Sequence, residues 1–153
     1  DNEFANTVLM PYVQTYVSTY GVPFLTNTTH SHDLCLNRFW ARISKEGDYQ
    51  SIHDHQSVFT FVIWLKIPFD GNEERSIQPN FRPEAGDFCL VYTDTTGQIL
   101  KKNWILTPEL EGTILVFPSR INHIVYPHFS TEDYRVAVAG DVSLSSYNPL
   151  NEI

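Results

Sequence analysis

The strongest constraint on the fold is a succession of short runs rich in Val, Ile, Phe, Tyr, Trp and Thr, with almost no helical period. These residue types favour the pleated, half-buried surface of a β-strand. Seven runs are expected to be strands: Phe39 to Ser44, Ser57 to Ile67, Phe88 to Thr93, Ile99 to Ile105, Thr113 to Phe117, His123 to Tyr126 and Tyr134 to Ser143. Turn-forming residues such as Asp70-Gly71-Asn72 separate them. The chain is therefore predicted to be mainly β, as a sandwich or a barrel.

Two segments depart from this pattern. Phe4 to Tyr20 carries apolar residues near a 3.6-residue period, which predicts an N-terminal helix despite the proline at position 11. Residues 69–86 are polar, contain Pro and Gly and show no periodicity, so we expect a mobile loop there. A length of 153 residues suits one domain, and we expect residues 1–153 to form it.

The charge and the cysteines exclude several classes of protein. Lys and Arg total 10 against 18 acidic residues, and the net charge of −8 opposes direct binding to nucleic acid. Cys35 and Cys89 lie in separate apolar runs, so neither a disulfide framework nor a thiolate zinc site is expected. No apolar stretch reaches the roughly eighteen residues of a membrane span. We therefore expect a soluble, cytoplasmic protein with reduced cysteines.

Three histidines have the spacing of a metal site. His53 and His55 are separated by one residue, and side chains at i and i+2 of a strand point to the same face, so both can reach one cation. His123 lies in a distant strand-like run and is the expected third ligand. Such a three-point set leaves coordination positions open, as a non-haem iron centre requires.

Other residues near these histidines leave alternatives open. Asp54 could replace His55 as a ligand, but neighbouring residues of a strand face opposite ways, so this would require a bulge. His30 and His32 form a second HxH in a loop-like stretch and are expected on the surface. His128 follows a proline outside the strand pattern and is expected at the edge of the site or in solvent.

Arg135 is the candidate for binding an anion. It lies in an apolar run, where a charged side chain that faces the core needs a carboxylate partner, and a dicarboxylate cosubstrate could supply one. In the alternative, Arg135 pairs with an acidic residue of the chain or faces water. Ordinary packing is likewise the alternative for four candidate neighbours of the pocket: Tyr49, Trp64, Tyr92 and Asn122.

Two stretches of the chain closely resemble the 2-oxoglutarate/Fe(II)-dependent oxygenases of cyanophages and other tailed phages. The first, Trp40 to Pro68, contains Gly47-Asp48-Tyr49 and the HxH motif, and the second runs from Gly112 through Phe117-Pro118 to Gly140. Together they cover about residues 37–143. The resemblance implies a double-stranded β-helix, a jelly roll of two antiparallel sheets.

The resemblance also implies a chemistry for particular residues. It makes His53 and His123 iron ligands, places His55 where the wider superfamily has the aspartate of HxD, and pairs Arg135 with the far carboxylate of 2-oxoglutarate. Tyr49 and Asn122 are then candidate contacts of this cosubstrate. The implied cofactors are Fe(II), 2-oxoglutarate and O2, with a further, unidentified primary substrate.

The chain departs from the superfamily at two positions. Ala137 stands where an Arg-x-Ser motif has its serine, so one hydrogen bond to the cosubstrate is expected to be missing. His55 replaces a carboxylate, and a neutral imidazole leaves the ferrous centre with one negative charge fewer. The metal centre should therefore differ in affinity and redox properties from a His-and-carboxylate site.

Two other functions fit the same pattern. Gly47 to His55 matches the first cupin motif, and Gly112 to His123 matches the core of the second, except that Arg120 stands at a position usually filled by glycine. A cupin-type metal protein that does not use 2-oxoglutarate is therefore an alternative. Another is a phage structural or binding protein that keeps the fold without catalysis. The primary substrate, a protein or prolyl side chain, a metabolite or a nucleobase, stays open, as does association into a homo-oligomer or a virion.

Overall fold

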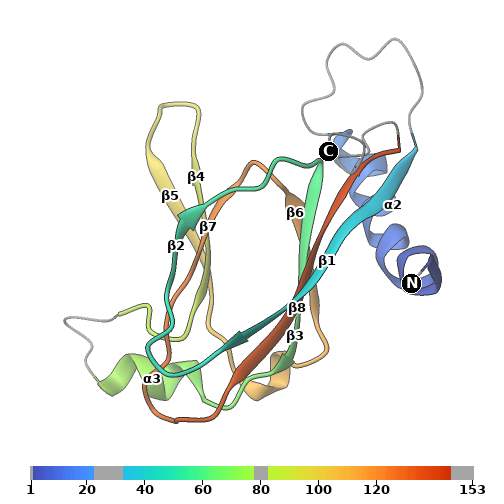
Figure 1. Cartoon of the computed structure of the whole chain (residues 1–153). Helices are drawn as coiled ribbons and strands as arrows, with labels where there is room; N and C mark the ends of the chain where they lie inside the picture. The colour runs from blue at the N-terminus through green and yellow to red at the C-terminus, as the bar shows by residue number, and fades with distance from the viewer. Residues whose placement is uncertain (1, 23–32, 78–82, 146–153) are drawn as a thin grey trace, which may run out of the picture.

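The strands form two four-stranded antiparallel sheets that face each other (Figure 1). The computed structural model describes residues 2–22, 33–77 and 83–145. In spatial order, the first sheet consists of β1 (Leu34–Ser44), β8 (Arg135–Leu144), β3 (Phe59–Lys66) and β6 (Ile114–Pro118). The second consists of β2 (Gln50–His53), β7 (Asn122–Val125), β4 (Phe88–Thr93) and β5 (Ile99–Trp104). The predicted mainly β fold, a double-stranded β-helix, is confirmed.

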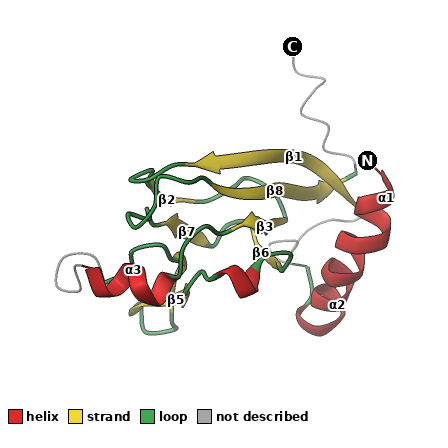
Figure 2. Cartoon of the chain, turned by 90° about the horizontal axis from the view of Figure 1, so that it is seen from below, coloured by secondary structure: helices red, strands yellow, loops and turns green. Residues whose placement is uncertain are grey.

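The predicted N-terminal helix is also present and covers the outer face of the first sheet (Figures 1 and 2). It consists of α1 (Asn2–Phe4), a π-helical segment (Ala5–Leu9) and α2 (Met10–Tyr20). Pro11 is the second residue of α2, which directly follows the π-helical segment, where the helix already departs from regular i→i−4 bonding. Leu9 and Val13 are fully buried and pack against β3 and β8. None of the described helices is long and apolar enough to cross a membrane.

Strand β3 is apolar on both faces because each face has a cover. Phe59 and Phe61 belong to the cluster under the N-terminal helix, whereas Val62 and Trp64 belong to the core between the two sheets. Alternation along the strand separates the two sets. A strand buried on both sides reads as a continuous apolar run, and this explains the strong sequence signal of the segment.

The structure differs from the sequence predictions in three elements. Strand β1 begins at Leu34, before the predicted start, and the short strand β2, assumed for the spacing of His53 and His55, is not among the seven predicted runs. The expectation of a loop over residues 69–86 is wrong for α3 (Gly71–Ile77). The carboxylate of Glu74 in this helix is buried and accepts backbone hydrogen bonds from the segment that precedes β8, at 2.9 and 2.8 Å. Residues 78–82 of the expected loop lie outside the described residues.

Gly140 allows β8 to lie between its two neighbours. A Cβ at this position would lie 2.4 Å from the carbonyl oxygen of Arg38 on β1 and 2.6 Å from a ring carbon of Phe61 on β3. No larger residue fits without displacing backbone. The glycine thus lets the inner face of β8, which carries Arg135 and Asp141, approach the second sheet in a fixed register.

Candidate active site

The three histidines predicted as metal ligands come together between the sheets. His53 ends β2 and lies directly opposite His123 of β7 in the strand register. One ligand atom from each of His53, His55 and His123 lies within 4.8 Å of the other two. The ring centroids of His53 and His123 are 4.0 Å apart. Cross-strand pairing therefore positions two of the three rings.

His55 reaches the cluster in a different way from the one expected. Strand β2 ends at His53, so regular alternation along a strand does not orient His55. Its backbone N–H instead donates to the carbonyl oxygen of Ser119, at 2.9 Å. Its ring stacks on Trp40, with centroids 5.5 Å apart and planes 18° apart. A loop-to-loop hydrogen bond and an aromatic contact thus place the third ring.

Each imidazole uses its Nδ1 atom for a hydrogen bond within the protein. The acceptors are the carbonyl oxygen of Ser51 for His53 (2.8 Å), that of Ile121 for His123 (3.4 Å) and Oδ1 of Asp141 for His55 (2.9 Å). Carbonyl and carboxylate oxygens only accept, so in each ring the proton lies on Nδ1 and the Nε2 lone pair is left for a ligand. Three such nitrogens fit a first-row divalent metal, including Fe(II).

The buried ring of His123 is held neutral, as a metal ligand must be. Burial, followed by the neighbouring imidazoles of His53 and His55, lowers the pKa of His123 from its ordinary value to about 4. The side chain is only 5% exposed. At neutral pH its nitrogen is therefore available for coordination without loss of a proton.

Asp141 provides a negative charge directly behind the cluster. Its Oδ1 atom accepts hydrogen bonds from His55 Nδ1 at 2.9 Å and from the Thr60 hydroxyl at 2.8 Å. Burial by itself would raise the pKa of Asp141, but the hydrogen bonds from His55 and Thr60 outweigh it, and the pKa is lowered. The carboxylate is therefore ionised and orients the ring of His55. It partly offsets the absence of a carboxylate among the three candidate ligands.

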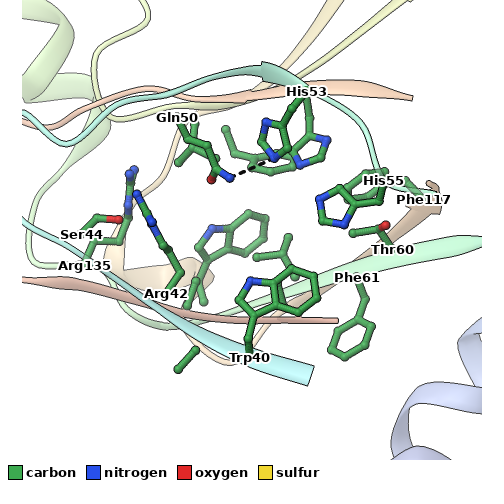
Figure 3. A pocket seen from close by; sticks show the side chains of 18 residues that line it. Trp40, Arg42, Ser44, Gln50, His53, His55, Thr60, Phe61, Phe117 and Arg135 are labelled. Atoms are coloured by element: carbon green, nitrogen blue, oxygen red, sulfur yellow. Dashed lines mark hydrogen bonds between the residues drawn. The ribbon is translucent and has the colours of Figure 1, made fainter. Parts of the chain in front are cut away.

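The three histidines line one part of a cavity of about 200 Å³ between the sheets. Aromatic side chains, among them Trp40, Trp64, Phe88 and Phe117, form much of its wall. Arg42, Ser44 and Arg135 lie together at the end away from the labelled histidines, with Gln50 between the two groups (Figure 3). The amide of Gln50 donates to Nε2 of His53 at 3.0 Å, a hydrogen bond that a metal at this nitrogen would replace.

Arg135 faces this cavity and is 3% exposed. Its Nη1 atom donates to the carbonyl oxygens of Tyr126 (3.1 Å) and Gly86 (3.4 Å). No carboxylate of the described residues pairs with it, and it does not face bulk water, so neither alternative from the sequence is found. Burial, followed by the like charge of Arg42, lowers the pKa of Arg135 to about 10. The guanidinium therefore stays charged at neutral pH, with Nε and Nη2 unpaired among the described residues.

Comparison with known families identifies the chain. The model of the family described as "Putative 2OG-Fe(II) oxygenase" matches residues 38–141. The chain belongs to this family. No curated protein matches it.

A solved oxygenase structure supports the same fold. An oxidoreductase of the 2OG-Fe(II) oxygenase family from Burkholderia pseudomallei is similar with a TM-score of 0.55 at 15% identity, over 88% of this chain. The match covers 51% of that protein, so this chain spans about half its length. A cupin domain from Bordetella pertussis Tohama I matches with a TM-score of 0.38 at 12% identity, over 78% of this chain and 99% of that domain.

Several predicted residues of this oxygenase-family chain lie away from the cavity. Asp54 is exposed, pairs with Arg120 at 3.3 Å and is not part of the histidine cluster. Tyr49 is 53% exposed, and neither it nor Asn122 nor Tyr92 is among the residues that line the cavity, whereas Trp64 is. Strand alternation explains Asn122, because its neighbour on β7 points inward.

The structure tests the prediction for His128 but not the prediction for the second HxH motif. His30 and His32 lie outside the described residues. The prediction for His128 is wrong, because the side chain is fully buried, stacks on Phe69 and lies 3.1 Å from the carbonyl oxygen of Asp133 through Nε2. It is not among the residues that line the cavity. A position after proline therefore did not indicate exposure.

Arg42, Gln50 and Asp141 were not predicted as residues of the site, although the positions of Arg42 and Asp141 on their strands indicated a shared face. Asp141 lies six positions after Arg135 on β8, so both share the inner face of that strand. Arg42 and Trp40 share a face of β1 in the same way. Gln50 belongs to β2, a strand that is not among the seven predicted runs.

Proposed function

We propose that this protein is a non-haem Fe(II) and 2-oxoglutarate-dependent oxygenase. The observation that carries the proposal is the combination, in one cavity, of three imidazoles whose unprotonated Nε2 atoms can bind a metal and a buried arginine without a carboxylate partner among the described residues. The three imidazoles suit a metal, and the arginine suits an anion. Membership of the oxygenase family supports the same assignment.

The three histidines would hold the iron through Nε2. Bound there, ferrous iron would supply the oxidative chemistry, in which O2 decarboxylates 2-oxoglutarate to succinate and the primary substrate is oxidised. His53, His55 and His123 are oriented before the metal arrives, because each Nδ1 atom is already fixed by a hydrogen bond. Such pre-orientation lowers the cost of assembling the site.

Arg135 would bind the far carboxylate of 2-oxoglutarate. Its unpaired Nε and Nη2 atoms are one edge of a planar fork that matches a carboxylate with two parallel hydrogen bonds. The backbone carbonyls of Tyr126 and Gly86 hold the other side of the guanidinium in place. The aromatic wall would exclude water and so strengthen this charge pair.

A cupin-type metal protein is the second candidate. The observation in its favour is the ligand set, since three imidazoles without a carboxylate occur where the superfamily usually has HxD. Arg135 favours the oxygenase instead, because a binding site for 2-oxoglutarate needs a cation at that end of the cavity. A non-catalytic phage protein has no specific observation in its support. Phage origin, cytoplasmic location, a protein or prolyl substrate and a single domain over residues 1–153 stay predictions.

Anaerobic calorimetric titration with Fe(II) tests the metal site. We expect one Fe(II) per chain, with binding abolished in His53→Ala and His123→Ala because each removes one of three nitrogens. Asp54→Ala is the matched control and should bind as the wild type does, since Asp54 pairs with Arg120 outside the cluster. Wild-type affinity in both histidine variants would exclude this site, and lost binding in Asp54→Ala would make the aspartate a ligand.

A further inference from the structure

A second guanidinium lies beside Arg135 in the same cavity. In the antiparallel pairing of β1 with β8, Ser44 is opposite Arg135, and Arg42 is opposite Ala137. Arg42 and Arg135 are therefore diagonal neighbours on one face, within reach of each other for long side chains. Both line the cavity, and both point to the end that holds Ser44 (Figure 3).

This end of the cavity carries two positive charges and has no acidic side chain in its lining, while the negative charges of Asp48 and Glu74 act on Arg135 from outside the lining. No ion pair or side-chain hydrogen bond involves Arg42 among the described residues, and no Asp or Glu is among the residues that line the cavity. After burial, the positive charge of Arg42 is the next largest cause that lowers the pKa of Arg135. Two like charges side by side, one of them buried, are unfavourable unless an anion lies between them. The arrangement is therefore that of a binding site for an anion.

Arg42 also lies where it can replace the serine hydroxyl that the superfamily has and this chain lacks. The superfamily's Arg-x-Ser motif places a hydroxyl two residues after the arginine, and this chain has Ala137 there. Arg42 lies directly across the strand pair from Ala137. The small side chain at 137 leaves room on the shared face, and a donor from β1 can occupy it.

We propose that Arg42 is a second cosubstrate-binding residue, and that Arg42 and Arg135 together bind the far carboxylate of 2-oxoglutarate. The inference rests on the proposed function, since it assigns a further residue to the same ligand. Arg135 is buried and fixed by backbone carbonyls, whereas Arg42 is exposed and free to close on the ligand. Two guanidiniums make the site select 2-oxo acids that carry a second carboxylate.

Calorimetric titration of the anaerobic Fe(II)-loaded protein tests this with two probes, 2-oxoglutarate and 2-oxobutyrate, which lacks the far carboxylate. We expect Arg42→Ala to weaken 2-oxoglutarate binding about tenfold or more, because a charge-assisted hydrogen bond is lost. Arg42→Lys should recover part of the affinity, as a point charge without the planar fork. Affinity for 2-oxobutyrate should not change. Lys102→Ala is the control, since Lys102 is an exposed cation on β5 that does not line the cavity.

A double-variant cycle separates this inference from the proposed function. Arg42→Ala combined with Arg135→Ala should cost less than the two single losses added together, since both act on one carboxylate. Wild-type 2-oxoglutarate affinity in Arg42→Ala, with affinity lost in Arg135→Ala, would overturn the role of Arg42 and leave the proposed function standing. No 2-oxoglutarate binding to the wild-type Fe(II) protein would overturn the proposed function itself. Unchanged Fe(II) affinity verifies that each variant keeps its fold.

Discussion

Replacing Asp141 by Asn removes one negative charge behind His55 and nearly nothing else. The amide has the shape of the carboxylate, and its oxygen can still accept from His55 Nδ1, which lies 2.9 Å from Oδ1 in the native protein. A metal on Nε2 makes the ring more acidic, so the hydrogen bond to a carboxylate strengthens when the metal binds. The substitution should therefore weaken metal binding specifically.

The size of the effect follows from the type of hydrogen bond. A bond to a charged group contributes about 1.5–3 kcal/mol and a neutral one about 0.5–1.5 kcal/mol, a difference of roughly 1–1.5 kcal/mol. Since about 1.4 kcal/mol corresponds to tenfold, Asp141→Asn should lower Fe(II) affinity about fivefold to tenfold. Asp141→Ala should cost more, up to about 100-fold, because His55 and Thr60 both lose their acceptor.

Anaerobic Fe(II) calorimetry measures these affinities, and the Fe(III)/Fe(II) potential gives an independent readout. The potential should rise in Asp141→Asn, because removal of a nearby negative charge disfavours the ferric state. Asp54→Asn is the matched control, an exposed acid beside His55 that pairs with Arg120. Unchanged affinity and potential in Asp141→Asn, or equal changes in Asp54→Asn, would refute the coupling through His55.

Two further predictions concern the stability of the fold. Burial lowers the pKa of His128, so the contribution of its neutral ring is complete above about pH 6.5 and is lost as the pH falls toward the folded-state pKa. Urea unfolding between about pH 7 and 5 should show a smaller loss of stability in His128→Gln than in the wild type; parallel curves would contradict this. Gly140→Ala should lower the free energy of unfolding by about 1–3 kcal/mol, because its Cβ would meet the backbone of Arg38. Denaturation midpoints equal to the wild type would show that β8 can shift.

The sequence predicted the parts of the site that depend on local pattern. Runs of strand-forming residues predicted most of the strands, and the HxH spacing together with a distant histidine predicted all three rings of the cluster. Strand alternation, the expected reason, does not explain the position of His55. Strand β2 has ended before this residue, and a backbone hydrogen bond to Ser119 places it. A local pattern can thus identify a ligand without giving the geometry that orients it.

The missed features depend on contacts between segments far apart in the chain. The role of Arg42 follows from the register of β1 against β8, and that of Asp141 from a hydrogen bond to His55 across 86 positions. Helix α3 was missed although its start carries a local signal, because Asp70 accepts from the Asn72 backbone and Glu73 and Glu74 lie in the first turn. The contacts of Glu74 with residues that precede β8 could not be predicted from the segment itself. Pairing register is the information that a single sequence lacks.

Absorption spectroscopy of the anaerobic Fe(II) protein with 2-oxoglutarate tests the central claim most directly. The account predicts a metal-to-ligand charge-transfer band when 2-oxoglutarate is added, and succinate production when O2 is admitted. The band should need much higher 2-oxoglutarate in Arg135→Ala, roughly 30-fold or more, because a charge pair in a partly desolvated cavity is lost. Absence of both the band and succinate in the wild-type protein that has bound Fe(II) would contradict the oxygenase assignment and favour a cupin-type metal protein.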